Sequence, residues 1–341
     1  MWIAFPILNF EIHSEHSNEP LEKTLQLRSR SQYQRPHIKN FTLVKSSSKE
    51  NSQIDRWISF VLESNLEELN LWFGWSTTCY SLPQSVLVAK SLTVLTLKVC
   101  CLKSTCSDIN LPSLRKLSLK EVDADDEFIQ NLIFGCPAIE YMGIFCCQCI
   151  NSIKIFGLLK PMSMEIWGCQ CLKCIKIFSL PKLVEIKVHN NDLERFELEE
   201  SNLHYLCITE KHISELKLLP LKNLKKLCLD MPNLTEKWLH YHLSGLPLPE
   251  TLELTSCYML KRIKLSSHHH HLKSLGLSSC DNLVEVMVVS PILCRLSYYN
   301  TSDVAISILL NASDLLEVKY VIPAIIPGML KGLNSSQRWE I

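Results

Sequence analysis

The sequence predicts an α/β solenoid in which short parallel strands from successive coils form one sheet. Three observations favour this fold. An apolar motif recurs along most of the chain at steps of 20 to 28 residues, a related motif falls halfway along several short steps, and amphipathic helix patterns fill the longer ones. Repeats of this kind are considered first because they decide how the whole chain buries its apolar side chains.

The main motif is L-x-x-L-x-L, in which Ile, Val, Met or Phe can replace Leu. Thirteen copies begin at residues 38, 66, 92, 114, 139, 161, 183, 203, 224, 249, 272, 293 and 315, and those at 161 and 249 begin on proline. This spacing matches the period of roughly 20–29 residues in leucine-rich repeats. The last two apolar positions share one face of a strand, which a single strand cannot bury alone. We therefore expect a leucine-rich-repeat solenoid (horseshoe) with a parallel concave sheet.

The convex face is predicted to mix short strands and helices. Secondary copies of the motif begin at residues 172, 193, 213, 260 and 283 and predict strands on the back of the coils. The longer steps hold helix patterns over residues 54–62 with Ser52 as N-cap, over 128–133 with Gly135 and Pro137 as stop signals, and over 238–243. A helix advances about 1.5 Å per residue and a strand about 3.3 Å, so a helix needs more residues to cross the same face.

The repeat divides the chain into three parts. Residues 1–37 are interpreted as an N-terminal cap, residues 38–320 as an array of about 13 units, and residues 321–341 as a C-terminal cap or truncated tail. No apolar run approaches the length of a membrane span, and the apolar start lacks the basic region and cleavage site of a signal peptide. Sixteen cysteines in a chain of 341 residues without an export signal indicate reduced thiols and a cytoplasmic or nuclear protein.

Charge and motifs argue against nucleic-acid binding and catalysis. The 35 Lys and Arg residues balance 35 Asp and Glu residues, whereas phosphate binding needs a basic surface. No phosphate-binding glycine loop, H-E-x-x-H or G-x-S-x-G motif is present. The run His268 to His271 is predicted to be an exposed turn. We therefore expect no enzyme, no cofactor and no partner among nucleic acids or membranes.

Five cysteines occupy one position of the repeat. They are Cys100, Cys147, Cys169, Cys257 and Cys280, each three residues after the third apolar position of its motif. A small buried residue turns the chain at this position of a leucine-rich repeat. A ladder of buried thiols explains all five with one rule, so it is favoured over a metal site.

The residues predicted to bind a partner are the outward side chains of the main strands. On the concave face they are Glu68, Asn70, Trp72, Lys98, Lys116, Lys120, Tyr141, Phe145, Glu165, Trp167, Glu185, Lys187 and His189. The four rings, Trp72, Tyr141, Phe145 and Trp167, matter most, because exposed aromatic side chains dominate protein interfaces. The alternative is that a terminal segment or a loop covers some of them.

Several stretches resemble plant F-box/leucine-rich-repeat proteins. They are IDRWISFVLESNLEELNL (54–71), SLPQSVLVAKSLTVLTLKVC (81–100), INLPSLRKLSLKEV (109–122) and FIQNLIFGCPAIEYMGI (128–144), and WIAFPILNF (2–10) resembles the segment that follows the F-box. In that family the F-box docks onto the Skp-type adaptor of a cullin-based ubiquitin ligase, and the repeats select the protein to be ubiquitinated. The resemblance therefore implies a substrate-binding module for unknown target proteins.

The F-box itself, a helical segment, is not found in the sequence, which begins just after the place where it should end. A Skp-type adaptor and a cullin are therefore expected partners only if an F-box lies upstream. The main alternative is a free-standing interaction protein or decoy, whose overexpression would raise target levels. Two further alternatives are a repeat fragment of an immune receptor, which needs a nucleotide-binding domain upstream, and an enzyme, which needs a deep pocket with convergent titratable groups.

Overall fold

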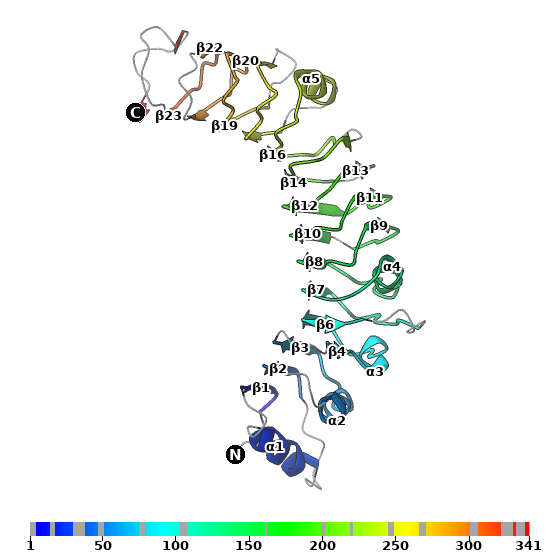
Figure 1. The fold of residues 1–341 in the computed structure, drawn as a ribbon. Helices are drawn as coiled ribbons and strands as arrows, with labels where there is room; N and C mark the ends of the chain where they lie inside the picture. The colour runs from blue at the N-terminus through cyan, green and yellow to red at the C-terminus, as the bar shows by residue number, and fades with distance from the viewer. Residues whose placement is uncertain are drawn as a thin grey trace. The chain divides into compact units, whose positions relative to one another are not determined.

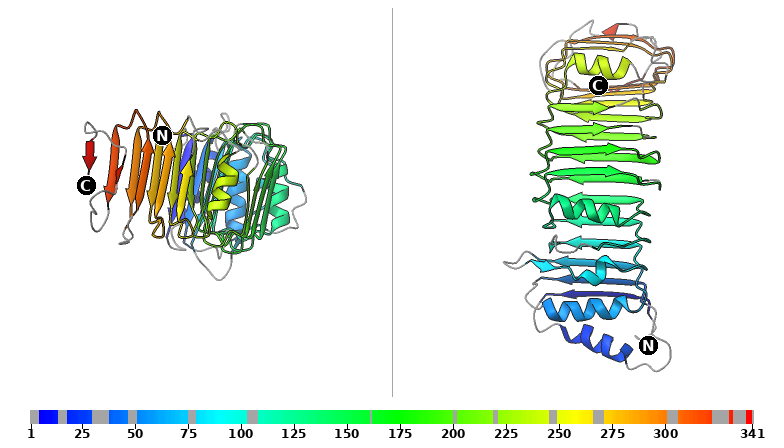
Figure 2. Two further views of the ribbon diagram at one scale, coloured as in Figure 1. Left: turned by 90° about the horizontal axis from the view of Figure 1, so that it is seen from above. Right: turned by 90° about the vertical axis from the view of Figure 1, so that its right-hand side faces the viewer.

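The computed structural model describes most of the chain as two compact units, Met1–Leu172 and Lys173–Ile341. The described residues are 5–13, 18–29, 38–46, 51–74, 79–102, 108–160, 162–199, 202–218, 221–244, 249–265, 271–300, 306–321, 330–331 and 338–340. Each unit is a solenoid whose main sheet contains parallel strands from successive coils (Figures 1 and 2). The predicted leucine-rich-repeat fold is confirmed.

Unit 1 begins with a strand that the sequence motif did not include. Its main sheet has the order β1 (Ile7–Ile12), β2 (Asn40–Lys45), β3 (Glu68–Phe73), β5 (Val94–Lys98), β7 (Lys116–Lys120), β8 (Tyr141–Phe145) and β10 (Met162–Trp167). Behind the sheet lie α2 (Asn51–Leu62), α3 (Gln84–Leu87), α4 (Asp126–Phe134) and β9 (Ser152–Phe156), seen in Figure 1. The remaining elements are α1 (Glu19–Ser29), next to β1, and the short pair β4 (Tyr80–Ser81) and β6 (Cys100–Cys101).

Unit 2 has one main sheet and two smaller sheets. The main sheet has the order β12 (Leu183–His189), β14 (Tyr205–Thr209), β16 (Lys226–Asp230), β17 (Thr251–Thr255), β19 (Ser274–Ser278), β21 (Arg295–Tyr299), β23 (Glu317–Val321) and β25 (Arg338–Glu340). Strands β11 (Cys174–Phe178), β13 (Arg195–Leu198) and β15 (Glu215–Leu218) pair in one back sheet. The other contains β18 (Arg262–Leu265), β20 (Glu285–Val289), β22 (Ser307–Asn311) and β24 (Leu330–Lys331), and α5 (Glu236–Ser244) falls between the two back sheets in the sequence.

The core of each unit contains the apolar positions of the motif. Neighbouring strands pair without an offset, so Leu69 lies beside Leu95 and Leu95 beside Leu117, and each of the three is at most 1% exposed. A buried leucine contributes about 1.5–3 kcal/mol relative to an exposed one, and every coil adds such residues to the same column. The residues that alternate with these buried positions along each strand face solvent, and the candidate binding residues are among them.

A left-handed turn follows many of the main strands. The residue directly after the strand has a positive φ at Val99 (55°), Cys146 (55°), Gly168 (72°), Ser256 (50°) and Ser279 (50°). The next residue is in each case a cysteine of the predicted ladder, and all five of these cysteines are fully buried. Their thiols point at backbone carbonyls, as in the 3.2 Å contact of Cys257 Sγ with Thr255 O. A small buried residue at the turn is thus confirmed.

The predicted elements of the back are also present, with one correction. Strands β11, β13, β15, β18 and β20 and helices α2, α4 and α5 lie where the patterns indicated. The prediction of Ser52 as N-cap is wrong, because α2 begins at Asn51 and Ser52 therefore lies in its first turn. In α4 the cap is Asp125, whose carboxylate accepts a hydrogen bond from the backbone N–H of Phe128 at 2.7 Å.

Candidate functional site

The solvent-facing side chains of the unit 1 sheet form rows, because its strands pair in register. One row, called the Trp–Lys row, contains Trp72, Lys98, Lys120, Phe145 and Trp167. A second row contains Glu68, Val94, Lys116, Tyr141 and Ser163, and the row between them contains Asn70, Thr96, Ser118, Gly143 and Glu165. The structure therefore brings all ten unit 1 candidates from the sequence together on one face.

The two tryptophans are the most exposed residues of the Trp–Lys row. Trp72 is 42% exposed and Trp167 is 45% exposed, while Lys98, Lys120 and Phe145 between them are half-buried. Four strand spacings separate the two indoles, or about 19 Å along the sheet. Indole rings bury a large area when a partner covers them, and their N–H can still find an acceptor. The row therefore offers two anchors at a fixed spacing.

Two further rings lie close together over a glycine. A Cβ atom added at Gly143 would lie 2.5 Å from Phe145 Cε2 and 3.0 Å from Tyr141 Oη, so the missing side chain leaves room for both rings. Lys116 Nζ lies 5.6 Å from the Tyr141 ring centroid, and the Tyr141 hydroxyl donates to Glu165 Oε2 at 3.3 Å. These contacts hold Tyr141 in place before any partner arrives, which lowers the entropy lost on binding.

A polar network borders this aromatic surface on strands β2 and β3. Asn40 Nδ2 donates to Glu68 Oε2 at 2.6 Å, and Asn70 Nδ2 donates to Thr42 Oγ1 at 3.2 Å. The side chains therefore hold each other in one arrangement across neighbouring strands. The face thus combines exposed rings with a fixed set of hydrogen-bonding groups, which is the composition of many protein interfaces.

The other three candidates, Glu185, Lys187 and His189, lie on β12 of unit 2. Lys187 Nζ lies 2.8 Å from Glu185 Oε1 and 5.4 Å from the Tyr205 ring centroid. His189 Nδ1 lies 3.1 Å from Thr209 Oγ1. All three side chains are half-buried and face the solvent side of their sheet.

The solvent-facing side of β12 continues along unit 2 at positions that were not among the predicted binding residues. Tyr205 and Cys207 on β14, and Lys226, Cys228 and Glu253 on the next two strands, extend the rows of Glu185 and Lys187. The same alternation of the motif marks these positions, so the signal was present in the sequence. Lys226 Nζ pairs with Glu253 Oε1 at 2.8 Å and lies 5.8 Å from the Tyr205 ring centroid, so Tyr205 lies within cation–π distance of two lysines.

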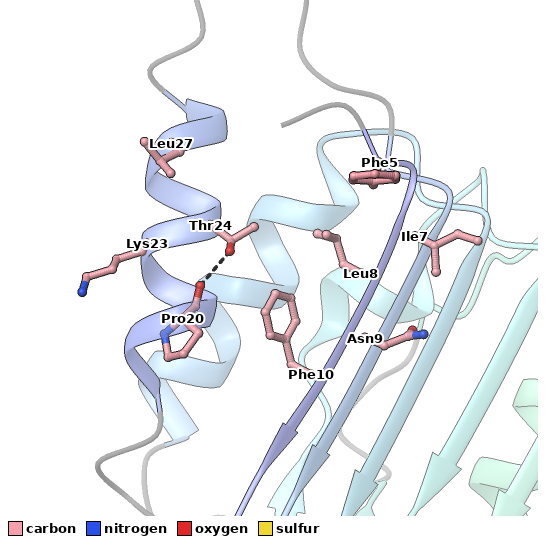
Figure 3. Close-up of a pocket in the computed structure, with 9 residues that line it drawn as sticks. All are labelled: Phe5, Ile7, Leu8, Asn9, Phe10, Pro20, Lys23, Thr24 and Leu27. Carbon is pink, nitrogen blue, oxygen red and sulfur yellow. Dashed lines mark hydrogen bonds between the residues drawn. The ribbon is translucent and has the colours of Figure 1, made fainter. Parts of the chain in front are cut away.

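An apolar groove of about 380 Å³ lies between β1 and α1 (Figure 3). Phe5, Ile7, Phe10 and Leu27 supply much of its wall. The Thr24 hydroxyl at its edge donates to Pro20 O at 2.7 Å, which satisfies that group locally. The groove thus has an apolar wall with a lysine, Lys23, as its titratable residue.

Among the described residues, no three His, Cys, Asp or Glu side chains come together in a way that could hold a metal ion. In the same part of the chain, no helix has the length and apolar character needed to cross a bilayer. His268, His269 and His270 of the histidine run lie outside the described residues, whereas His271 is exposed.

Stacked parallel strands with exposed tryptophans in register define a leucine-rich-repeat protein-interaction module. The chain belongs to the family described as At1g61320/AtMIF1, LRR domain, which matches residues 25–213 and 196–322. It is also similar to curated proteins of Arabidopsis thaliana. F-box protein At5g03100 is 30% identical over 157 residues, which are 46% of this chain and 48% of that protein. F-box/LRR-repeat protein 25 is 27% identical over 164 residues, 48% of this chain and 60% of that protein.

A third relative is more similar in sequence, but over a shorter stretch of the chain. F-box/FBD/LRR-repeat protein At4g26340 of Arabidopsis thaliana is 38% identical over 90 residues, which are 26% of this chain and 22% of that protein. The chain spans about half, or less, of the length of the first curated relatives it matches. These similarities support membership of the plant F-box/leucine-rich-repeat proteins.

Proposed function

We propose that this chain is the target-recognition part of an F-box subunit of a Skp-cullin-type ubiquitin ligase. The supporting observation is that the leucine-rich-repeat family matches residues 25–213 and 196–322, while the similar curated proteins carry F-box names. In this role the repeats bind the target protein, and an F-box on the same polypeptide recruits the Skp-type adaptor and the cullin. In this proposal the chain binds its target in the cytoplasm or nucleus, where the described cysteines, all free thiols, stay reduced.

The contact surface is the unit 1 face centred on the Trp–Lys row. Its indoles are the exposed anchors, and Lys98 and Lys120 between them place positive charge along the row. A target segment that fits this surface carries apolar side chains about 19 Å apart with acidic side chains between them. Such a partner would bury the rings and pair the ammonium groups, which gives both affinity and orientation.

The binding role is tested by replacing the two anchors. Trp72→Ala and Trp167→Ala should each weaken binding of a target about 30-fold, since truncating an interface hot spot costs roughly 2 kcal/mol. The matched control is Tyr241→Ala, because Tyr241 is 76% exposed but lies on helix α5. Binding is measured by calorimetry against a target first captured with the full-length natural product, and circular dichroism reports the fold.

Two outcomes would contradict this assignment. Unchanged affinity in both tryptophan variants would move the binding site away from the Trp–Lys row. Loss of the folded signal in these variants would show that the rings support the core rather than a partner.

The ligase role needs a separate experiment. The full-length natural product is immunoprecipitated from its own cells, and a Skp-type adaptor and a cullin should be recovered with it. Removing the gene should raise the level of the target protein. If no adaptor is recovered and overexpression raises target levels, the chain is a free-standing interaction protein or decoy instead.

A further inference from the structure

Two cysteines lie side by side on the solvent-facing side of the unit 2 sheet. Cys207 on β14 and Cys228 on β16 are direct register partners in a parallel pair of strands. Cys207 is half-buried and Cys228 is 8% exposed. They differ from the ladder cysteines Cys257 and Cys280, which are fully buried in the core. A pair of thiols on the outward face needs an explanation other than core packing.

Charged and polar neighbours surround this pair. Cys228 Sγ donates to Glu253 Oε2 at 3.0 Å, and Lys226 Nζ lies 2.8 Å from the other oxygen of the same carboxylate. The neighbouring Cys228 sulfur lowers the pKa of Cys207 to about 7, against the opposing effects of burial and the Glu253 charge, and the Tyr205 hydroxyl and the Lys226 charge add to the lowering. The Cys207 sulfur, burial and Glu253 raise the pKa of Cys228. The lowered pKa makes Cys207 the more readily ionised and more reactive thiol of the pair.

The register of the two strands places the Cα atoms of Cys207 and Cys228 at a separation that a disulfide can span. Neighbouring strands lie about 4.8 Å apart, which is inside the Cα separation of about 4.4–6.8 Å that disulfides span. A disulfide also needs its Cβ atoms to approach to about 3.5–4.5 Å, slightly closer than the strand spacing. The bond would therefore pull the strands together a little, and a strained disulfide of this kind is easily reduced again.

We propose that Cys207 and Cys228 form a reversible dithiol site for hydroperoxides, in which Cys207 reacts first and Cys228 resolves the product. The Cys207 thiolate attacks one peroxide oxygen, the O–O bond breaks, and Cys207 becomes a sulfenic acid while hydroxide leaves. Cys228 then transfers its proton to Glu253, and its sulfur attacks Cys207 sulfur. The S–S bond forms, the S–O bond breaks, and the departing hydroxide takes up that proton. The hydroxide released in the first step takes up from solvent the proton that Cys207 gave up when it ionised. In total two thiols lose two electrons and two protons, and hydrogen peroxide is reduced to two waters.

The chain offers two kinds of matched control for this chemistry. Cys174 and Cys294 are half-buried like Cys207, but the register partner of Cys174 is Arg195, and the Cys294 thiol donates to the Ile292 carbonyl at 3.4 Å. Cys257 and Cys280 also occupy equivalent positions after two paired strands, β17 and β19, but both are fully buried and their thiols donate to backbone carbonyls. The controls thus separate the effect of the thiol pair from the effect of exposure.

The first experiment measures alkylation of the reduced full chain by iodoacetamide, with mass spectrometry of each cysteine between pH 5 and pH 10. Cys207 should react with a midpoint near pH 7, and about threefold faster than Cys174 and Cys294 at that pH, because a larger thiolate fraction outweighs its lower intrinsic nucleophilicity. Cys257 and Cys280 should stay unmodified. Equal rates at Cys207, Cys174 and Cys294 would overturn the proposal.

The second experiment treats the chain with hydrogen peroxide and maps its peptides without reduction. A peptide linked through Cys207 and Cys228 is expected, and a thiol reductant should remove the link. Cys228→Ser should stop at a sulfenic acid on Cys207, trapped by dimedone, whereas Cys207→Ser should give neither product. The proposal would be overturned if peroxide oxidised the wild-type chain but left Cys207 and Cys228 unlinked. This outcome does not depend on how the variants fold.

Discussion

Glu210 accepts two hydrogen bonds from Asn191 through one carboxylate oxygen. The backbone N–H of Asn191 donates to Oε1 at 3.1 Å and its side-chain Nδ2 donates to the same atom at 2.8 Å. Both residues are buried, at 1% and 7% exposure. Asn191 comes three residues after Val188, at the position that the ladder cysteines occupy in other coils. A polar pair therefore replaces a thiol at this turn.

This pair makes stability depend on pH at Glu210. Burial raises the pKa of the Glu210 carboxyl, and the hydrogen bonds from Asn191 oppose that rise only in part. The folded chain thus holds this proton more tightly than the unfolded chain does. By linkage, the contribution of Glu210 to stability is full below the unfolded pKa of about 4.3 and is lost as pH rises through the folded value.

Glu210→Gln should therefore raise the melting temperature at pH 7, because the amide keeps an acceptor oxygen but has no buried charge. The increase should shrink at pH 4, where the native carboxyl is protonated. Thermal unfolding at the two pH values measures the effect. Glu199→Gln, at an exposed glutamate after β13, is the control and should change neither value. An equal gain at both pH values would mean that charge at Glu210 plays no part.

The cap of helix α4 gives a second prediction. Asp125→Ala removes the acceptor for the Phe128 N–H and should lower the free energy of unfolding by about 1 kcal/mol. Asp125→Asn keeps a side-chain acceptor and should lose much less. Urea denaturation followed by circular dichroism compares the two variants, and equal losses would show that the carboxylate charge matters more than the hydrogen bond.

The rings above Gly143 give a third prediction. Gly143→Ala places a methyl group 2.5 Å from Phe145 Cε2 and 3.0 Å from Tyr141 Oη, so the Phe145 ring must shift and the Tyr141 hydroxyl must move slightly. Target binding should weaken about tenfold, since losing a preorganised contact costs about 1.4 kcal/mol. Ser118→Ala is the matched control, because Ser118 is the register partner of Gly143 on β7. Calorimetry measures both variants, and similar affinities would separate the rings from the binding surface.

Alternation along a strand gives a fourth prediction. Leu97 is 1% exposed, and its neighbour Thr96 is half-buried on the opposite face of β5. Leu97→Ala should cost about 2–5 kcal/mol of unfolding free energy, whereas Thr96→Ala should stay within about 0.5 kcal/mol. Urea titrations of both variants test this, and similar losses would mean that the two faces of β5 are not distinguished by burial.

The main strands could be read from the sequence because each copy of the motif repeats the same alternation. The same motif also occurs as Ile150-Ile153-Ile155 and as Phe5-Leu8-Phe10, and these copies, which correspond to β9 and β1, were overlooked. Strand β22 had a weaker signal, since its copy begins on Ala305. Helix α1 gave no clear apolar stripe, and its buried residues include the charged Arg28, whose Nη2 donates to Phe5 O at 2.7 Å.

The candidate site was predictable in position but not in detail. Alternation placed Trp72 and Trp167 on the outward face, but their exposed fractions depend on how neighbouring side chains pack. The motif likewise places Cys207 and Cys228 at equivalent positions of adjacent coils. Their chemistry depends on the Lys226–Glu253 ion pair and on Tyr205, which come from three strands. Such electrostatic neighbourhoods arise only after folding, so no local pattern reports them.

The zero-offset pairing of the strands also decides where the chain tolerates insertions and deletions. A residue added inside β5 would exchange its two faces, so that Leu97 would point to solvent and Lys98 into the core. A residue added between main strands leaves every face unchanged, and the steps between motif copies already differ by up to eight residues. Insertions and deletions are therefore tolerated in the segments at the back of each coil, whereas the residue pattern of each main strand has to be kept.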